Sequence, residues 1–515
     1  MSLNFNNQQF NNFASQNKPT ILFKKLASDL ITPVLAFSKL KTNFENYSFL
    51  FESVEKGNNK GRFSLIGLMP NKIWKTVDGV AYINDNHNFN SEFEIDNKGS
   101  VIESLRSFIK SSQFDYDELN KIYADQRGVL EAINMASGVF GYASYDLVRF
   151  FENIPNRNLP DPIGIAQSIF IKPQIILVFD SLFDQLFICS PVTEFDNTYQ
   201  EIKDLIEKIE SIIFYEDRAK KKIDEKIINK INHYQFKFTA NVDEKIYCEM
   251  VKKAKEYIIN GDVFQVLPSQ RFVAEYPEFL DEFDFYRSLR IVNPSPFLFY
   301  FKFDDFVITG SSPEIMASLK DEEITIRPLA GTRKRGVNNA EDKLIAQELL
   351  KDEKELAEHL MLIDLGRNDV GRVAKAGSVA VTEKMSIENY SHVMHISSTV
   401  KGKLQSGFDA LDVMIAGFPA GTVSGAPKIR AMEIIEEIEP EKRSFYAGCV
   451  GYFASNGNSE TCITLRSALF KNNKIYLQSG AGVVFDSDPK SEYQECLNKA
   501  KALMVACDKI KDFFN

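Results

Sequence analysis

Two stretches in the second half of the chain carry glutamate pairs at the same helical spacing, so a fold that uses all four must bring two distant helices to one site. Glu355 and Glu358 lie in KELAEHLMLIDLGRND, and Glu492 and Glu495 lie in DPKSEYQECLNKAKAL. Side chains three residues apart share one face of a helix. Four carboxylates with few basic neighbours favour a hard divalent cation. Mg²⁺ is the best match, with a negatively charged substrate completing its shell.

The charged stripe of the C-terminal stretch also has a simpler interpretation. Asp488 suits the N-cap of a helix and Pro489 its first position. On that helix Glu492, Glu495 and Lys499 border an apolar face. A single pair of this kind is more often a solvated helix edge, because exposed charges are common on helices. Two pairs beside glycine-containing loops favour a site.

Size and composition limit the class of protein. At 515 residues the chain exceeds one compact core and predicts two domains or one large two-lobed domain. Hydrophobic residues make up 44% and charged residues 26%, as in ordinary globular proteins. The formal net charge of -10 argues against broad binding to nucleic acid or to acidic membranes. A local basic pocket for an anionic small molecule remains compatible with it.

Cysteine usage and hydropathy predict a cytoplasmic protein. The 6 cysteines are scattered without CxxC pairs, which favours free thiols in a reducing compartment and no structural zinc. Residues 1–19 are rich in Asn and Gln and lack a basic leader and an apolar core, so we expect a flexible tail and no secretory signal. No apolar run approaches the roughly 20 residues that span a bilayer.

The residue pattern divides the chain into two parts. Over residues 20–236, short β-rich runs alternate with polar turns and helical patterns, as in an α+β domain, and the lysine-rich segment 217–237 predicts a linker or a solvated helix. Residues 237–515 open with a helical pattern ending at Gly261, and DVFQVLPSQRF then predicts a strand. SGVFGYASYD and AGCVGYFASNG echo each other weakly, but one short match does not establish a duplication.

Two glycine-containing segments can present backbone N–H groups to an anion. In FPAGTVSGAPKIRAM, Ser424 is placed to cap the following helix, whose N-terminus could hold a carboxylate or phosphate. A tight turn explains these glycines equally well, and their spacing does not match a P-loop. RPLAGTRKRG offers Thr332 as a hydroxyl donor, but alone it predicts a surface turn.

Two side chains in predicted strands can carry chemistry. His395, in HVMHISSTV, is at such a place more often a satisfied core group than an acid or base, although its pKa suits proton transfer. Arg466 interrupts the apolar run TCITLRSALF and needs an anionic partner, either a structural acid or a substrate carboxylate. Cys449, in AGCVGYF, does not match the nucleophile elbow of a glutaminase, so amide-derived ammonia has to come from elsewhere.

A set of segments in the second half resembles the chorismate-using enzymes, and most closely the anthranilate synthase component I family. The segments are NPSPFLFY, GSSPE, RPLAGTRKRG, AEHLMLIDLGRND, HVMH, GTVSGAPKIRAM, YAGCVGY, TCITLRSA and GAGVVFDSDPKSEYQE. The first half is similar more thinly, through LFESVEKG, GRFSLIG and GVFGYASYD. The resemblance implies a two-lobed α+β fold, with large antiparallel sheets packed inside outer helices and the active site in the cleft.

The resemblance also implies an activity and its partners. The chain would convert chorismate and ammonia to anthranilate and pyruvate with Mg²⁺, as the first step of tryptophan biosynthesis. Ammonia would come from glutamine through a separate glutaminase subunit, component II, in a heterotetramer. Tryptophan would act as the feedback inhibitor.

The same resemblance implies roles for single residues. Glu358 and Glu495 would bind Mg²⁺ directly, and Glu355 and Glu492 would support it through water. Glu314, in GSSPE, would be the general acid that protonates the departing 4-hydroxyl as a nucleophile attacks carbon 2, which requires a raised pKa. The catalytic set is Glu314, His395, Thr332 and Gln265, with His395 assisting loss of pyruvate. The positions that bind substrate are Gly331, Thr332, Tyr446, Arg466, Gly480, Gly482 and Lys499.

Two positions separate the chain from related chorismate enzymes. Gln265 stands where isochorismate and salicylate synthases carry a lysine that activates water, so ammonia is the expected nucleophile. Ala330 stands where aminodeoxychorismate synthases usually carry a nucleophilic lysine. Both residues favour anthranilate as the product.

The family's tryptophan site is also matched. The matching positions are Glu52, Ser53, Asn293, Pro294, Ser295, Pro296 and Cys462, together with Phe297 and Leu298, which replace the usual Tyr and Met, while Phe51 replaces a Leu. These exchanges largely conserve size, so we expect feedback inhibition to persist.

Two alternatives remain open at this point. Aminodeoxychorismate synthase component I would give an aminated product that keeps its enolpyruvyl group. A catalytically silent protein that binds chorismate or tryptophan and regulates a partner belongs to a different class. That hypothesis predicts loss of some of the catalytic and metal-binding residues, yet Glu314, His395 and the four glutamates are all present.

Overall fold

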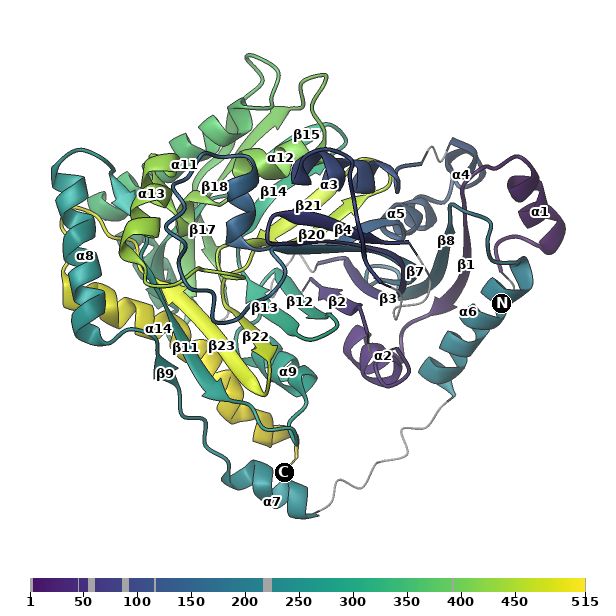
Figure 1. Ribbon diagram of the computed structural model, residues 1–515, viewed down its shortest axis with the longest axis horizontal. Coiled ribbons are helices and arrows are strands. Elements are labelled where there is room, and N and C mark those ends of the chain that lie inside the picture. Colours follow the sequence, from purple (N-terminus) through teal and green to yellow (C-terminus); the bar gives the residue numbers. More distant parts are fainter. Residues whose placement is uncertain are drawn as a thin grey trace.

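The computed structural model describes residues 3–44, 46–53, 61–85, 92–114, 117–215, 225–390 and 393–514 (Figure 1). Its α-helices are α1 Asn7–Ser15, α2 Pro33–Leu40, α3 Val101–Lys110, α4 Asp117–Ile122, α5 Arg127–Met135, α6 Tyr199–Phe214, α7 Glu225–His233, α8 Glu244–Ile259, α9 Glu282–Val292, α10 Asn339–Leu349, α11 Glu353–Gly371, α12 Ala410–Gly417, α13 Lys428–Ile438 and α14 Pro489–Asp508. Short 3₁₀ helices are η1 Tyr145–Phe150, η2 Gly421–Val423 and η3 Lys509–Phe513.

The strands come from both halves of the chain. They are β1 Thr20–Ala27, β2 Ser48–Glu52, β3 Phe63–Val77, β4 Val80–Asn84, β5 Glu94–Ile95, β6 Gly138–Ala143, β7 Ser168–Asp180, β8 Gln185–Val192, β9 Thr239–Ala240, β10 Gln265–Val266, β11 Ser269–Glu275, β12 Phe297–Lys302, β13 Val307–Ser312, β14 Ile315–Lys320, β15 Glu323–Ile326, β16 Leu329–Lys334, β17 Ala380–Asn389, β18 Val393–Lys403, β19 Gly425–Ala426, β20 Cys449–Ala454, β21 Ser459–Ile463, β22 Ser467–Lys471 and β23 Lys474–Gly480.

Within the described ranges, every strand except β10 and β19 belongs to one network of antiparallel pairs. The long strands β3 and β7 pair with each other. From β3 the network continues through β2, β12, β13, β22, β23 and β11. From β7 it continues through β6, β20, β21, β14, β15 and β18. The predicted α+β class with a large antiparallel sheet is confirmed, and the domain boundary near residue 236 stays a prediction.

The two segments with similar sequences lie side by side in this network. SGVFGYASYD contains β6 and AGCVGYFASNG contains β20, and Gly141 of the first is paired with Gly451 of the second. A Cβ on Gly451 would lie 2.1 Å from the carbonyl oxygen of Glu460 on the neighbouring strand β21. The shared glycine therefore has a packing reason at this crowded point.

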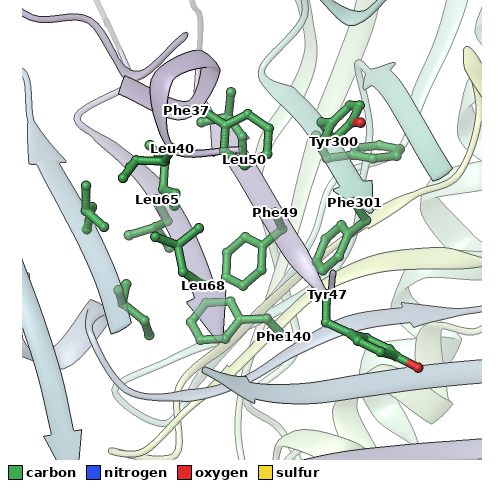
Figure 2. Packing of buried hydrophobic residues seen from close by; sticks show 14 of the residues in the cluster. Phe37, Leu40, Tyr47, Phe49, Leu50, Leu65, Leu68, Phe140, Tyr300 and Phe301 are labelled. Carbon is green, nitrogen blue, oxygen red and sulfur yellow. The ribbon is translucent and has the colours of Figure 1, made fainter. Parts of the chain in front are cut away.

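Aromatic residues join the two halves in the core. Phe49 of β2 stacks on Phe140 of β6 with ring centroids 4.8 Å apart and on Phe301 of β12 with centroids 5.0 Å apart (Figure 2). All three rings are fully buried. Burying one such side chain stabilises a fold by about 1.5–3 kcal/mol, so this cluster favours a single folded body.

The N-terminal segment is folded where a flexible tail was expected. Helix α1 begins with a capping box between Asn6 and Gln9, and it lies beside α6 (Figure 1). Phe10 and Phe13 are buried in the core. These two rings give the Asn- and Gln-rich segment an apolar face, which its average composition did not show.

The lysine-rich segment 217–237 is described only in part. Residues 216–224 lie outside the described residues, and α7 follows them. Ile231 of α7 is buried, whereas most other positions of the helix are exposed or partly exposed. No helix in the described ranges is long and apolar enough to cross a membrane.

Candidate active site

The two helices with paired glutamates begin where local sequence directs them to begin. Asp352 caps α11 by accepting hydrogen bonds from the N–H groups of Lys354 and Glu355. Asp488 caps α14 by accepting from Ser491 N–H, and Pro489 occupies the first helical turn, as predicted. The paired glutamates therefore lie in the N-terminal halves of α11 and α14.

The carboxylate of Glu358 meets Gln265 at the centre of the site. Gln265 Nε2 donates a hydrogen bond to Glu358 Oε1 at 2.7 Å. Burial raises the pKa of Glu358, as do the nearby charges of Glu355 and Glu495, while the bond from Gln265 opposes the shift. The carbonyl oxygen of the Gln265 side chain is buried and has no hydrogen-bond partner in the described residues. A small donor molecule could occupy that position.

Gly482 is required by the same contact. A Cβ at Gly482 would lie 2.8 Å from Gln265 Nε2 and 3.8 Å from Glu358 Oε1. The neighbouring Val483 forms a bridge with Val266, next to Gln265 in the chain. The loop after β23 therefore closes over the Gln265–Glu358 pair, and any larger residue would push it away.

The remaining glutamates are partly neutralised by cations. Glu495 pairs with Lys499 at 2.7 Å, and Glu355 pairs with Arg333 at 2.8 Å. Burial raises the pKa of Glu492, and the charge of Glu495 adds to the shift. Few basic neighbours were expected around these acids, and that expectation is wrong for Glu495 and Glu355. Arg333 lies in β16, which precedes α11 in the chain, and its contact with Glu355 depends on how this strand packs beside the helix.

These carboxylates match a hard divalent cation by their chemistry. Burial raises the pKa values of Glu358 and Glu492, repulsion from neighbouring carboxylates adds to the shifts, and a bound cation would favour the charged forms. In the part of the chain that the structure describes, however, no group of three or more Asp, Glu, His or Cys side chains is close enough to hold a metal ion. The donor set thus fits the ion, while the side chains are not gathered around one point.

RPLAGTRKRG forms strand β16 instead of the predicted surface turn. Its pairing with β18 shifts register between Ala330 and Thr332, and Gly331 at this bulge has a φ of 60°. Left-handed backbone favours glycine because it lacks a Cβ. A Cβ there would also lie 3.2 Å from Glu355 Oε2. The bulge therefore turns the Gly331 backbone toward the glutamates.

His395 lies opposite Thr332 in the same pair of strands. Its Nδ1 lies 3.1 Å from the Gly331 carbonyl oxygen and 3.1 Å from Thr332 Oγ1. A carbonyl oxygen can only accept, so Nδ1 carries the proton and Nε2 keeps its lone pair. Burial lowers the pKa of His395 to about 4, with smaller contributions from the charges of Arg466 and Lys499. The imidazole is therefore neutral near pH 7 and can accept a proton at Nε2.

Glu314 is buried where β13 leads into β14. Burial raises the pKa of its carboxyl group to about 8, against the opposing effect of a 2.9 Å hydrogen bond from Thr422 Oγ1. The group is therefore protonated at neutral pH and can act as an acid. Thr422 lies in GTVSGAP but was not singled out by the sequence analysis. In the sequence Thr422 is only a hydroxyl in a glycine-rich loop, and that pattern does not show that it contacts Glu314.

The expected cap of the following helix is wrong. Ser424 Oγ donates to the carbonyl oxygen of Ala420 at 2.9 Å, and α13 follows Pro427 without a side-chain cap. The segment first forms the 3₁₀ turn η2, which places Ser424 too early to reach the helix. Strand β19 then pairs with β10, so that Gln265 lies opposite Ala426.

Arg466 breaks the apolar run into two strands. It lies between β21 and β22 with a φ of 52°. Burial lowers the pKa of its guanidinium, while Tyr446 and Glu495 oppose the shift. Arg466 has no ion-pair partner within the described residues, so a substrate carboxylate could supply the missing anion. Tyr446 is buried nearby, and Lys499 Nζ donates to the Gly480 carbonyl oxygen at 3.1 Å.

Most of the residues matched to a tryptophan site lie on strands β2 and β12 or beside their ends. Glu52 lies opposite Leu298 in the β2–β12 pair, and Phe297 lies opposite Ser312 in the β12–β13 pair. Arg290 donates to Glu52 at 3.0 Å. Asn293 ends α9, Ser295 is buried, Ser53 follows β2, and Cys462 lies in β21 opposite Ile315. Residues Val54–Gly57 of the LFESVEKG match lie outside the described residues.

Comparison with known proteins identifies the family of the chain. The model of the chorismate binding enzyme family matches residues 68–505. The chain belongs to this family. Anthranilate synthase component 1 of Cereibacter sphaeroides is 44% identical over 96% of this chain and 95% of its own length, and that of Aquifex aeolicus is 40% identical over 99% and 98%. The crystal structure of anthranilate synthase component I from Streptococcus pneumoniae superposes with a TM-score of 0.75, at 33% identity over 93% of this chain and 99% of that one. Within the family, the chain therefore groups with the component 1 proteins of anthranilate synthase.

Proposed function

We propose that the chain is the chorismate-aminating subunit of anthranilate synthase, working in the cleft of a two-lobed α+β fold with a separate glutaminase as its partner. The balanced reaction is chorismate plus ammonia giving anthranilate, pyruvate and water. The observation that carries the proposal is that the chain holds both a buried protonated acid, Glu314, and a buried neutral base, His395. Glu314 has a pKa of about 8 and His395 a pKa of about 4, so both hold the required protonation state near pH 7.

In the first step ammonia attacks carbon 2 of the chorismate ring and the 4-hydroxyl leaves. Glu314 gives its proton to that hydroxyl, which departs as water, and the newly bonded nitrogen releases one proton, which balances the one that Glu314 gave. The free carbonyl oxygen of Gln265 can accept a hydrogen bond from the incoming ammonia, because no described residue occupies it. A lysine at this position could instead deprotonate water, so an amide favours ammonia as the nucleophile.

In the second step the aminated intermediate loses its enolpyruvyl group as pyruvate. His395 Nε2 accepts the proton at carbon 2, and the electron pair left behind completes the aromatic ring as the C–O bond breaks. The departing enolate takes up one proton and becomes pyruvate. Thr332 and the Gly331 carbonyl hold the imidazole by its Nδ1–H. Aromatisation of the ring drives this step.

Two cationic side chains of the site would bind the substrate carboxylates. Arg466 and Lys499 supply the positive charge, with Tyr446, Gly480, Gly482 and the Gly331–Thr332 bulge lining the pocket. Glu358 and Glu495 would hold Mg²⁺ directly and Glu355 and Glu492 would support it through water. When bound, the ion would neutralise a substrate carboxylate and orient the ring. The charged groups explain how two anionic ends of one small molecule could be held without a strongly basic protein.

Feedback inhibition by tryptophan is part of the same proposal. Glu52 would bind the amino group beside the NPSPFL segment, and Cys462 would line the pocket. A short path leads from there to the general acid, because Phe297 pairs with Ser312 and the Ser312 hydroxyl donates to the Glu314 carbonyl oxygen at 3.2 Å. A change at the tryptophan site could thus reach Glu314.

The test is an incubation of the purified chain with chorismate, an ammonium salt and MgCl₂, followed by anthranilate fluorescence with and without EDTA. The proposal predicts fluorescence that requires all three components and disappears with EDTA. Chorismate that stays unchanged under these conditions would refute it. Glutamine should replace ammonium only after the glutaminase partner is added.

A further inference from the structure

The buried Arg443 contacts three segments that border the proposed active site. Arg443 is 2% exposed. Its guanidinium donates to the Val423 carbonyl oxygen at 2.7 Å and to the carbonyl oxygen of Leu267, and it pairs with Glu439 at 2.7 Å. A planar guanidinium presents its N–H groups in a fixed fork, so its contacts fix the relative positions of the groups that accept from it.

The two carbonyl groups belong to two segments, each of which contacts a different proposed functional side chain. Val423 follows Thr422, whose hydroxyl contacts the general acid Glu314. Leu267 follows Gln265 by two residues, and Gln265 contacts Glu358. Arg443 therefore links the backbone next to Thr422, which contacts the acid, to the backbone near Gln265, which is proposed to contact ammonia.

The third segment that Arg443 contacts includes the aromatic ring of Tyr446. The guanidinium carbon lies 5.8 Å from the ring centroid of Tyr446, which lines the proposed substrate pocket, and 5.0 Å from that of Tyr145. The N–H of Tyr446 also donates to the Arg443 carbonyl oxygen at 3.3 Å. The side chain and the backbone of one residue thus both contact the residue that faces the substrate.

Glu439 anchors the arginine from behind. Its Oε1 accepts hydrogen bonds from Ser269 N–H at 2.8 Å and from Ser269 Oγ at 2.9 Å, at the start of β11. Every strong contact of the pair is therefore internal, and none reaches the surface. A buried ion pair is weak evidence for stabilisation on its own, because desolvation of the charges opposes their attraction.

We propose that Arg443 is a positioning residue for the amination of chorismate. It keeps the Thr422–Glu314 contact and the Gln265–Glu358 contact in register, so that acid and nucleophile reach the same ring together. The inference rests on the proposed function for the roles of Glu314 and Gln265. Misplacing a reacting group by about 1 Å can cost about 100-fold in rate, so loss of the fork should lower turnover more than binding.

Arg271 provides a matched control. It is also 2% exposed, and it donates to Gln478 Oε1 at 3.2 Å, to the Lys442 carbonyl oxygen, and to Glu441 at 2.9 Å. None of these partners belongs to η2 or to residues 265–267. Lys442 does precede Arg443 in the chain, and Gln478 Nε2 donates to Ser269 Oγ, which contacts Glu439. Arg271→Lys therefore removes the same fork at the same degree of burial from beside Arg443, but it leaves the contacts behind Thr422 and Gln265 in place.

The experiment measures chorismate consumption with ammonium and MgCl₂, together with thermal unfolding, for both lysine variants and for Glu439→Gln. We expect Arg443→Lys to lower kcat about 10–100-fold with the chorismate KM changed less than about threefold. Arg271→Lys should change kcat less than about threefold at a similar fall in unfolding temperature. Glu439→Gln keeps the packing and should lower kcat by an intermediate amount.

A coupling measurement separates positioning from general destabilisation. Thr422→Val and Arg443→Lys should be non-additive in kcat, because both disturb the same contact with Glu314. Equal losses of kcat in Arg443→Lys and Arg271→Lys, or a raised KM at unchanged kcat, would overturn the proposal. Because consumption of chorismate is followed whatever the product, a product other than anthranilate would refute the proposed function and leave this comparison valid.

Discussion

Replacing Glu314 by glutamine tests whether the buried carboxyl group carries a proton. In the folded chain the pKa of this group is about 8, against an ordinary value of 4.5. The folded state therefore keeps a proton that the unfolded chain releases, and stability falls as pH rises between these two values. Glutamine has a similar shape and accepts the Thr422 hydrogen bond, but it never ionises.

The size of the effect follows from the two pKa values. Between about pH 6 and about pH 8 only the unfolded chain is ionised, and each pH unit costs about 1.4 kcal/mol, so the native protein loses about 3 kcal/mol relative to Glu314→Gln by about pH 9. Urea unfolding at the two pH values can be followed by the fluorescence of Trp74, the single tryptophan, which is fully buried.

The same variant has a kinetic consequence. Loss of the general acid should lower kcat by about 10²–10⁴-fold without unfolding the chain. If wild type and Glu314→Gln showed the same change of stability between the two pH values, the carboxyl group would already be ionised at neutral pH. The assignment of Glu314 as the acid would then be wrong.

Further predictions concern the other groups of the site. Glu358→Gln should abolish Mg²⁺-dependent turnover with the fold retained, measured against Glu353→Gln, an exposed glutamate on the same helix; equal activity of both variants would contradict the metal role. Arg466→Gln should raise the chorismate KM about 10–100-fold, because a charged hydrogen bond contributes about 1.5–3 kcal/mol, and an unchanged KM would remove it from the pocket. Thr422→Val removes a donor that lowers the pKa of Glu314, so the alkaline limb of the kcat profile, calculated on free ammonia, should move to higher pH; a shift to lower pH would refute the contact. Saturating tryptophan should inhibit the wild type, and Glu52→Gln should need more tryptophan for the same inhibition, whereas insensitivity of the wild type would disprove the regulatory site.

Features of the site that depend on local sequence could be predicted. The capping of α14 by Asp488 and the helical spacing of the four glutamates follow from residues near each other in the chain. The catalytic roles of Glu314 and His395 came from the family resemblance, because the residue pattern alone singled out no role for Glu314 and favoured a core position for His395. The α+β class followed from the alternation of β-rich runs and helical patterns.

Other features depend on contacts between distant segments. Arg333 neutralises Glu355 only because β16 packs beside α11, and Thr422 reaches Glu314 across more than a hundred residues of chain. The glycine turn expected at Gly331 is a β-bulge, since pairing with β18 overrides the local turn signal. Phe10 and Phe13 fold the N-terminal segment by docking on a core that no local pattern could locate.

The most direct test of the account is the ratio of products formed from chorismate and ammonium. Anthranilate, pyruvate and consumed chorismate are measured by mass spectrometry in one incubation with MgCl₂. The account predicts one anthranilate and one pyruvate for each chorismate consumed. An aminated product that keeps its enolpyruvyl group, formed without pyruvate, would contradict it and would assign the chain to the aminodeoxychorismate reaction.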